Sequence, residues 1–357
     1  MKKKKGSNVY EKKITLGRDE YGMPIRKSIT GRTISELNAR IEQARQTWMQ
    51  MNSGTDSILF ATYARRWLAS TKAVRSLNTR QMYENVIEKH IIPEIGDYYF
   101  DEISLSDLQG IINRRAEKYE TCNKIRLTLR QIYAAAADDG IKFDAKPDRL
   151  VLPPKKPNEK RALTEEEKKA IFEADLTEEQ AAFVHLLYYT GLRREEALAL
   201  TAADLDFNNR IVTVHKSLIF DQNAPILKET TKTSTSTRSV LIPSVFVAEL
   251  ASYAKDKNIL FPPPRFKRDE YMSLSSYVKF WNGIIKKLIP LAPSAKDLTA
   301  HIFRHNYATM LYYSKVSIKK AAQLLGHSGT QMIMQVYAHL DDEQERTAEK
   351  IDTIFDK

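Results

Sequence analysis

The sequence predicts an α+β protein of several domains. Residues 1–54 form a small strand-and-helix segment, residues 55–152 an all-helical segment, and residues 162–340 a mixed, mainly helical segment with a small antiparallel sheet. Apolar residues alternate in two short stretches of the first segment, recur three and four residues apart in the second, and do both in the third. A chain of 357 residues is long enough for two or three such domains.

The first segment has the pattern of two strands and a helix. Residues 8–16 and 23–30 alternate as strands do, and a turn-forming GRDEYG stretch separates them. A helix follows, with Ser35 as its expected N-cap. Its apolar face is predicted to consist of Leu37, Ile41, Ala44 and Trp48.

The second segment has four stretches of helical periodicity, and a linker follows it. The stretches cover residues 59–71, 78–96, 104–119 and 122–140. Ser104 and Ser106 are candidate caps, and Gly140 stands where a helix should end. Residues 153–161, PPKKPNEKR, are rich in proline and basic side chains, which predicts a semi-rigid basic linker.

The third segment combines strand and helix patterns. Residues 210–220 and 238–243 are strand candidates, with residues 221–237 as the connection between them. A helical pattern returns at Ser273 and continues to the end of the chain.

The charge of the chain favours a polyanionic partner. Subtracting 45 Asp and Glu from 56 Lys and Arg gives +11, and residues 1–54 alone carry +7, from 12 basic and 5 acidic side chains. Because no basic helix with a bulky apolar face occurs there, nucleic acid is favoured over a membrane surface. A high isoelectric point is also common in proteins that bind no nucleic acid, so charge alone leaves both readings open.

Several protein classes are disfavoured by composition. No run of about 18 apolar residues occurs, so no membrane span is expected, and the basic N-terminus lacks the apolar core of a signal peptide. The single Cys122 excludes an internal disulfide framework and a cysteine-based zinc site. These features together predict a cytoplasmic protein.

The stretch TGLRREEALAL predicts an anion site or a neutralised surface. Gly191 should end one helix, and the next should begin at Leu192 or Arg193. Arginines at a helix N-terminus oppose the helix dipole unless an anion lies over it or nearby carboxylates compensate. Glu196, three residues after Arg193, can hold that guanidinium, so both interpretations remain open.

Five further residues carry side chains suited to chemistry. His301 and Arg304 share a helical face with His305, and the two histidines raise the question of zinc. Ile302 stands where a zinc-protease helix needs glutamate, so a metal is disfavoured. Lys232 lies in a Thr- and Ser-rich turn, while His327 precedes a short helical stretch that ends at Tyr337. Taken singly, each could be ordinary surface or core.

In chain order, these residues resemble the catalytic signature of the tyrosine recombinases, above all the integrases of phages and conjugative transposons. The motifs TGLRREE, TKTSTSTR, HIFRH, LGHSG and QVYAH carry the resemblance. They match the family at Arg193, Lys232, His301, Arg304, His327 and Tyr337, with Glu196 as acidic support. The resemblance implies an arm-binding domain at residues 1–54, a SAM-like core-binding domain at 55–152 and a catalytic domain at 162–340. The tail helix expected at 341–357 has two places open to it, on its own domain or on a neighbouring subunit, and the resemblance favours the neighbour.

The resemblance also implies a reaction. Tyr337 is the expected nucleophile and forms a 3′-phosphotyrosine ester with DNA, while Arg193 and Arg304 clamp the phosphate. Lys232 is expected to protonate the leaving 5′ oxygen, His301 to handle the tyrosine proton, and His327 to bond a phosphate oxygen. Neither metal nor ATP is expected. The remaining tyrosines Tyr307, Tyr312 and Tyr313 are expected to be core residues.

The expected partners are double-stranded DNA, at core-type and arm-type attachment sites, and further copies of the chain in a tetramer. An excision accessory or DNA-bending protein is a further candidate partner. Three alternatives remain beside integration and excision of a mobile element or phage genome. They are a type IB topoisomerase-like enzyme, a catalytically inactive DNA-binding regulator, and a metal-dependent tyrosine nuclease, for which the chain lacks a His-x-His pair.

Overall fold

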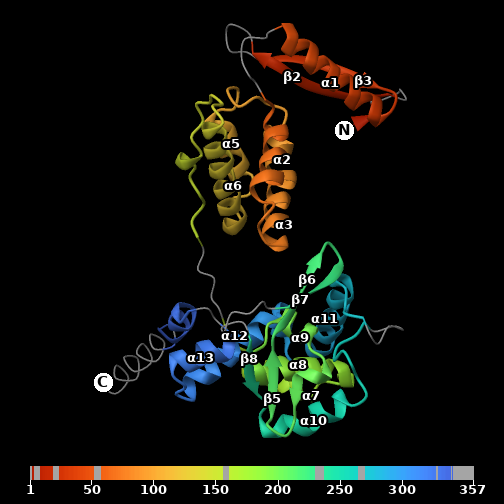
Figure 1. Cartoon of the computed structure of the whole chain (residues 1–357), viewed down its shortest axis with the longest axis vertical. Coiled ribbons are helices and arrows are strands. Elements are labelled where there is room, and N and C mark those ends of the chain that lie inside the picture. The colour runs from red at the N-terminus through yellow and green to blue at the C-terminus, as the bar shows by residue number, and fades with distance from the viewer. Residues whose placement is uncertain are drawn as a thin grey trace. The chain divides into compact units, whose positions relative to one another are not determined.

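A computed structural model gives two compact units, residues 1–157 and 158–357 (Figure 1). The residues that the structure describes are 2–3, 9–18, 24–51, 58–155, 161–229, 237–263, 270–326, 329–338 and 340. The predicted tail helix at 341–357 lies outside them.

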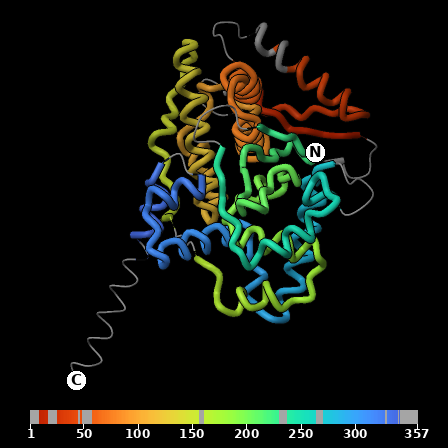
Figure 2. The backbone as a smooth tube through the Cα atoms, turned by 60° about the horizontal axis from the view of Figure 1, so that its bottom comes forward, coloured from red at the N-terminus to blue at the C-terminus, as the bar shows by residue number. Residues whose placement is uncertain are grey.

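The first unit begins with a three-stranded antiparallel sheet, and a helix lies along it (Figure 2). Its elements are β1 (Lys2–Lys3), β2 (Tyr10–Arg18), β3 (Pro24–Gly31) and α1 (Ile34–Met51). A small core forms where the inward face of the hairpin meets the helix, made of Ile14, Leu16, Ile29, Leu37 and Ile41. The helix begins one residue before the predicted N-cap Ser35, because the Thr33 hydroxyl accepts the Glu36 amide at 3.1 Å. The side chain of Trp48 lies outside the described residues.

The rest of the first unit is helical. Its elements are α2 (Phe60–Thr71), α3 (Leu77–Val86), a π-helical turn (Ile87–Ile91), α4 (Ile92–Ile95), α5 (Leu105–Asn113), α6 (Tyr119–Asp138) and a 3-10 turn (Pro147–Arg149). Ser104 forms the expected cap, in a capping box with Asp107. Gly140 ends the α6 region with φ +78°.

One helix predicted in this region is interrupted. Residues 78–96 were expected to be continuous, yet the structure passes from α3 through the π-helical turn to α4. Pro93 supplies the reason, since it lacks an N–H and its ring crowds the carbonyl of Lys89 one turn earlier. The wider π-helical turn accommodates Pro93, so the chain remains helical from α3 to α4.

The second unit contains seven labelled α-helices, two short 3-10 helices and five strands among its described residues. The helices are α7 (Glu165–Glu173), α8 (Glu178–Thr190), α9 (Arg194–Ala199), α10 (Ser244–Ala254), α11 (Leu274–Leu288), α12 (Ala300–Tyr313) and α13 (Ile318–Leu325), with 3-10 turns at Ala202–Asp204 and Pro293–Asp297 among them. Residues 331–338 form a last described helical segment. Phe183, Phe246, Phe261 and Phe303 lie fully buried in the main core.

The strand predicted at residues 210–220 is two strands in different sheets. β4 (Leu205–Asp206), β5 (Ile211–Val214) and β8 (Arg238–Leu241) form one antiparallel sheet, and β6 (Lys216–Asp221) pairs only with β7 (Ala224–Glu229). The division falls at His215 and Lys216, which bind the buried Asp204 at 2.7 and 2.8 Å. These contacts turn the chain out of the first sheet, and β7 occupies part of the predicted connection.

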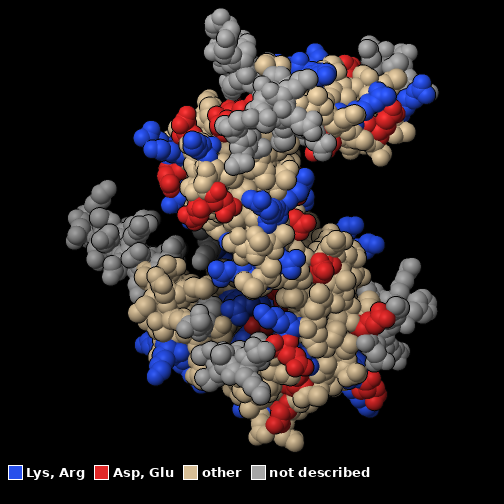
Figure 3. Space-filling model, turned by 45° about the horizontal axis from the view of Figure 1, so that its top comes forward, with Lys and Arg blue, Asp and Glu red and all other residues tan. Residues whose placement is uncertain are grey.

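The described part of the chain has no helix that is both long and apolar enough to cross a membrane. Basic and acidic side chains are interspersed over the face drawn in Figure 3, so the net charge of +11 is not segregated into one continuous patch there. The local arrangement of particular arginines therefore has to identify a site for an anion.

Candidate active site

A tight turn between α8 and α9 presents Arg193. Gly191 ends α8 with φ +62°, a left-handed conformation that favours glycine. A Cβ atom at this position would lie 2.5 Å from Cδ1 of Tyr307, so the turn also leaves no room for a side chain here. Arg193 follows as the N-cap residue of α9, which begins at Arg194, one residue after the later of the two predicted starts.

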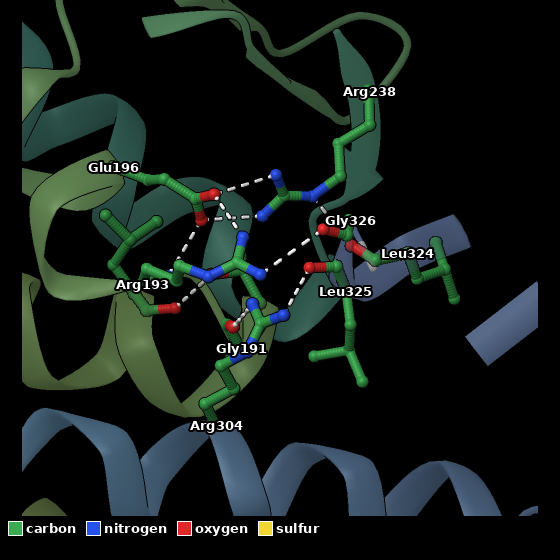
Figure 4. Close-up of polar contacts among 10 residues, drawn as sticks. Gly191, Arg193, Glu196, Arg238, Arg304, Leu324, Leu325 and Gly326 are labelled. Atoms are coloured by element: carbon green, nitrogen blue, oxygen red, sulfur yellow. Dashed lines mark hydrogen bonds and ion pairs between the residues drawn. The ribbon is translucent and has the colours of Figure 1, made fainter. Parts of the chain in front are cut away.

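The carboxylate of Glu196 joins Arg193 to a second arginine, Arg238 of β8 (Figure 4). Its Oε1 accepts from Nη1 of Arg193 and Nη1 of Arg238, both at 2.9 Å. Its Oε2 accepts from the backbone amide of Arg193 at 2.8 Å and from Nη2 of Arg238 at 2.6 Å. Each oxygen therefore holds one donor from each arginine, and the predicted Arg193–Glu196 contact is confirmed.

This network keeps Glu196 ionised although it is buried. Burial acts to raise the pKa of the carboxyl, but the hydrogen bonds and charge of Arg238, followed by those of Arg193, outweigh it and lower the pKa to about 2. The carboxylate therefore carries its negative charge at neutral pH.

Three successive backbone carbonyls at the end of α13 each accept from a different arginine (Figure 4). Leu324 accepts from Nε of Arg238 at 2.9 Å, Leu325 from Nη2 of Arg304, and Gly326 from Nη2 of Arg193 at 3.3 Å. The last carbonyls of a helix have no partner within the helix and carry its negative dipole end, so guanidinium groups satisfy them well. The end of α13 therefore gathers arginines from α9, β8 and α12.

Arg304 is almost fully buried, with 4% exposure, and its Nη1 donates to the carbonyl of Gly191 at 3.0 Å. Burial lowers the pKa of its guanidinium; the charges of Arg193 and Arg238 add to that effect, and Glu196 opposes it. Three guanidiniums here face a single carboxylate, an excess of two positive charges within this network. An anion bound beside them would relieve the mutual repulsion.

A pocket of about 360 Å³ opens beside this network. Its lining includes Arg193, Arg194, Tyr277, Trp281, His301 and Arg304. His301 lies in the first turn of α12 and its ring contacts that of His305 at a centroid distance of 4.6 Å. The pocket therefore brings together three of the residues that the sequence singled out, one from α9 and two from α12.

Tyr337 occupies a different environment. Its ring is 7% exposed and packs among apolar residues of α12 and α13, with its centroid 5.0 Å from that of Tyr312. Its hydroxyl donates to the carbonyl of Val316 at 3.1 Å. Tyr312 lies eight residues after Arg304 on α12, about 12 Å along the helix axis. Burial raises the pKa of the Tyr337 hydroxyl, so the group is a neutral phenol in this state.

The other tyrosines divide. Tyr307 and Tyr312 pack in the same cluster as Tyr337, as expected. Tyr313 is 57% exposed, so its expected place in the core is wrong; it lies on the outward face of the last turn of α12.

Lys232 and His327 lie outside the described residues. Arg238 was missed at the sequence level. The signal was present, because residues two apart on a strand share a face and Arg238 is in phase with the fully buried Val240. A charge on an inward strand face needs a buried partner, and Glu196 is that partner.

The sequence model described as the phage integrase family matches residues 161–344, more than half of the chain. The chain belongs to this family. A second model, the N-terminal SAM-like domain of phage integrases, matches residues 59–115 of the helical region. The resemblance to tyrosine recombinases read from the motifs is thereby confirmed.

This integrase-family chain is similar to several curated proteins. It is 24% identical to a XerC-like tyrosine recombinase of Caldanaerobacter subterraneus over 99% of its own length and 97% of the relative. It is 27% identical to the transposase of transposon Tn916 from Enterococcus faecalis, covering 80% of this chain and 75% of that protein. The ICEBs1 integrase of Bacillus subtilis is 26% identical, with 90% and 89% covered.

Solved structures show the same fold. The Tn1549 transposon integrase in complex with a circular intermediate DNA superposes with a TM-score of 0.66 at 23% identity, covering 81% of this chain and 100% of that one. A λ integrase tetramer bound to a Holliday junction gives 0.58 at 17% identity, with 88% and 92% covered. The predicted tyrosine recombinase fold is thus confirmed.

Proposed function

We propose that this protein is a site-specific recombinase that cuts and rejoins DNA strands to integrate and excise a mobile element. The observation that carries the proposal is the pocket beside Arg193, His301 and Arg304, where an excess of buried positive charge faces space for a phosphate. Two guanidiniums can form paired hydrogen bonds with the non-bridging oxygens of a phosphodiester, and they match its negative charge best as it grows in the transition state.

The proposed nucleophile is Tyr337. Its phenolic oxygen forms a bond to phosphorus, the bond to the 5′ oxygen breaks, and Lys232 gives that oxygen its proton. His301 receives the phenol proton, and His327 donates to a phosphate oxygen. Since the 3′-phosphotyrosine linkage is itself a phosphodiester that replaces the broken one, a 5′ hydroxyl of another strand can attack it, release the tyrosine and rejoin the DNA without ATP or metal.

Tyr337 has to leave its present place for this reaction. Its hydroxyl bonds the Val316 carbonyl, and its ring packs beside Tyr312 near the C-terminal end of α12, whereas Arg304 and His301 lie near the N-terminal end. We infer that DNA binding and assembly release the segment at residues 331–338 so that the phenol reaches the pocket. A tetramer on DNA, with the tail at 341–357 docked on a neighbour, would couple release to assembly.

The first unit is proposed to hold the duplex. The face of the N-terminal sheet that turns away from α1 carries Lys13 and Arg26 beside Ser28 and Thr15, their cross-strand neighbours. A basic, hydroxyl-rich sheet face suits contacts with phosphates and base edges at arm-type sites. The helical region at 55–152 is proposed to bind core-type sites, and the basic linker at 153–161 to follow the duplex between the two units.

The decisive experiment uses a nicked DNA substrate that traps covalent protein–DNA adducts, with EDTA present and ATP absent. The wild type is expected to form an adduct, and Tyr337→Phe to bind the same DNA without forming one. Tyr313→Phe, the same change at an exposed tyrosine, should react as the wild type does. An undiminished adduct with Tyr337→Phe would end the proposal, and relaxation of plasmids without any target site would favour a topoisomerase.

A further inference from the structure

We propose that Arg238 is a positioning residue for the strand-cleavage reaction: it fixes the orientation of Arg193 through Glu196 and joins that pair to the end of α13. The inference rests on the proposed role of Arg193 at the phosphate. Arg238 was not among the residues that the motifs identified, and its part follows from the contacts of its guanidinium.

The Glu196 carboxylate receives hydrogen bonds from two arginines. Arg193 alone gives the carboxylate one donor on each oxygen, from Nη1 and from its backbone amide. That pair is local, because both donors belong to a residue only three positions earlier in the chain. Arg238 adds a second donor to each oxygen, at 2.9 and 2.6 Å, from a strand on the opposite side. The carboxylate plane is thereby fixed from two directions.

Arg238 also contacts the C-terminal end of α13. Nε of Arg238 donates to the carbonyl of Leu324 at 2.9 Å, two residues before Gly326, whose carbonyl receives Arg193. A Cβ atom at Gly326 would lie 2.6 Å from Nη1 of Arg238, so the glycine turn packs directly against this guanidinium. Arg238 thus sets the position of both groups that hold Arg193, the carboxylate and the Gly326 carbonyl.

The burial and the hydrogen bonds of Arg238 exclude direct contact between this side chain and DNA. The side chain of Arg238 is only 7% exposed, and its Nε, Nη1 and Nη2 all donate within the protein. Arg193, in contrast, has 39% of its side chain exposed and lines the pocket. Arg238 therefore acts through Arg193 and does not touch the substrate.

A lysine cannot reproduce this arrangement, because one ammonium group cannot form two parallel bonds to a carboxylate and a third to a carbonyl. Arg238→Lys retains the buried positive charge while losing the geometry. We expect this variant to bind DNA as the wild type does and to cleave about a hundredfold more slowly, the loss that a misplacement near 1 Å can cause.

The test compares two substrates, each with one scissile linkage: an ordinary phosphodiester and a methylphosphonate, whose neutral phosphorus centre needs no guanidinium to balance a non-bridging charge. If Arg238 acts through Arg193, the loss shown by Arg238→Lys shrinks to less than about threefold on the methylphosphonate. An equal loss on both substrates would mean a general structural effect, and no loss on either would mean no role; both results overturn the inference.

Two variants separate this inference from the proposed function. Arg193→Ala, assayed on the same substrates, should be defective on the phosphodiester and relieved on the methylphosphonate; an Arg193→Ala enzyme that cleaves the phosphodiester normally would overturn the proposed function itself. Arg161→Lys is the matched control. It removes another bidentate pair, with the fully buried Glu167 of α7 at 2.6 and 2.7 Å, and should show no difference between substrates.

Folding is controlled with a double variant. Glu196→Gln/Arg238→Gln removes both buried charges together and leaves neither ion unpaired, so it should fold even if a single change does not. It is expected to give the same substrate pattern as Arg238→Lys, since the paired bonds between Arg238 and Glu196 that orient Arg193 are lost in both variants. A double variant that cleaves the phosphodiester at the wild-type rate would overturn the inference.

Discussion

The hydroxyl of Tyr337 donates a hydrogen bond to the backbone carbonyl of Val316 at 3.1 Å, in the turn between α12 and α13. This contact stores the proposed nucleophile as a buried, neutral phenol while Arg193, His301 and Arg304 already line their pocket. The proposed phosphate-binding residues thus line their pocket while the proposed nucleophile lies elsewhere.

Tyr337→Phe should lower the stability of the protein without DNA. The change leaves the partly buried Val316 carbonyl without its donor, at a cost of about 1 kcal/mol in free energy of unfolding. Urea denaturation measures the loss. Tyr313→Phe removes a hydroxyl from an exposed ring and should leave the midpoint unchanged. Equal stability of wild type and Tyr337→Phe would show that the hydroxyl does not rest on Val316.

Acid should destabilise the protein through Glu196. Its pKa is lowered to about 2 in the folded state from an ordinary value of 4.5, so the stabilisation is complete above pH 4.5 and is lost as the pH falls toward 2. The loss amounts to about 3 kcal/mol, from roughly 1.4 kcal/mol for each pKa unit. The free energy of unfolding of the wild type and Glu196→Gln should therefore differ most above pH 4.5 and converge below it.

Glu195→Gln is the matched control for that experiment. Glu195 neighbours Glu196 in the sequence, but it is partly exposed and pairs only with Arg194 among the charge contacts described. Screening by solvent makes such a pair weak, so its variant should be nearly as stable as the wild type at neutral pH. A large, pH-dependent effect of Glu195→Gln would contradict the assignment to Glu196.

Gly191→Ala should destabilise the protein more than Gly140→Ala. Both glycines have positive φ, +62° and +78°, and alanine costs about 1 kcal/mol for the backbone alone. At Gly191 the new methyl group also meets the Tyr307 ring, whereas nothing lies within 4 Å at Gly140. Thermal melts should rank the two variants in that order, and Gly191→Ala should also slow cleavage because its carbonyl holds Arg304.

Lys13→Ala/Arg26→Ala should weaken binding to arm-type DNA and reduce its salt dependence. Two lost phosphate contacts reduce the slope of log K against log salt by about 2. Fluorescence anisotropy over a salt series measures it. Lys27→Ala removes one exposed charge from the opposite face of the hairpin, the face that carries Ile14 and Ile29, and it should leave the slope nearly unchanged.

Local patterns in the sequence predicted the elements that depend on local chemistry. The helix pair around Gly191, the contact of Glu196 with Arg193, and the shared helical face of His301 and Arg304 all follow from spacing and helix geometry. The π-helical turn before Pro93 could in principle have been predicted, since a proline inside a helical pattern marks an interruption.

Other features depend on contacts between distant residues, which spacing does not encode. The division at His215 arises because Asp204 binds both His215 and Lys216, and alternation alone cannot show that a strand changes sheets. The resting place of Tyr337 depends on how α12, α13 and the last helical segment pack together. The order of the motifs singled out Tyr337 as the candidate nucleophile, but it could not predict where its ring packs in the protein without DNA.

The arginines at the end of α13 meet main-chain oxygens of Leu324, Leu325 and Gly326. Every amino acid has a backbone carbonyl oxygen. Exchanging the two leucine side chains, without changing the backbone conformation, would therefore leave these three hydrogen bonds in place. A survey that scores positions by side-chain replacement would consequently report the packing of the two leucine side chains. It would miss that the peptide groups of residues 324 and 325 hold two of the arginines around the pocket.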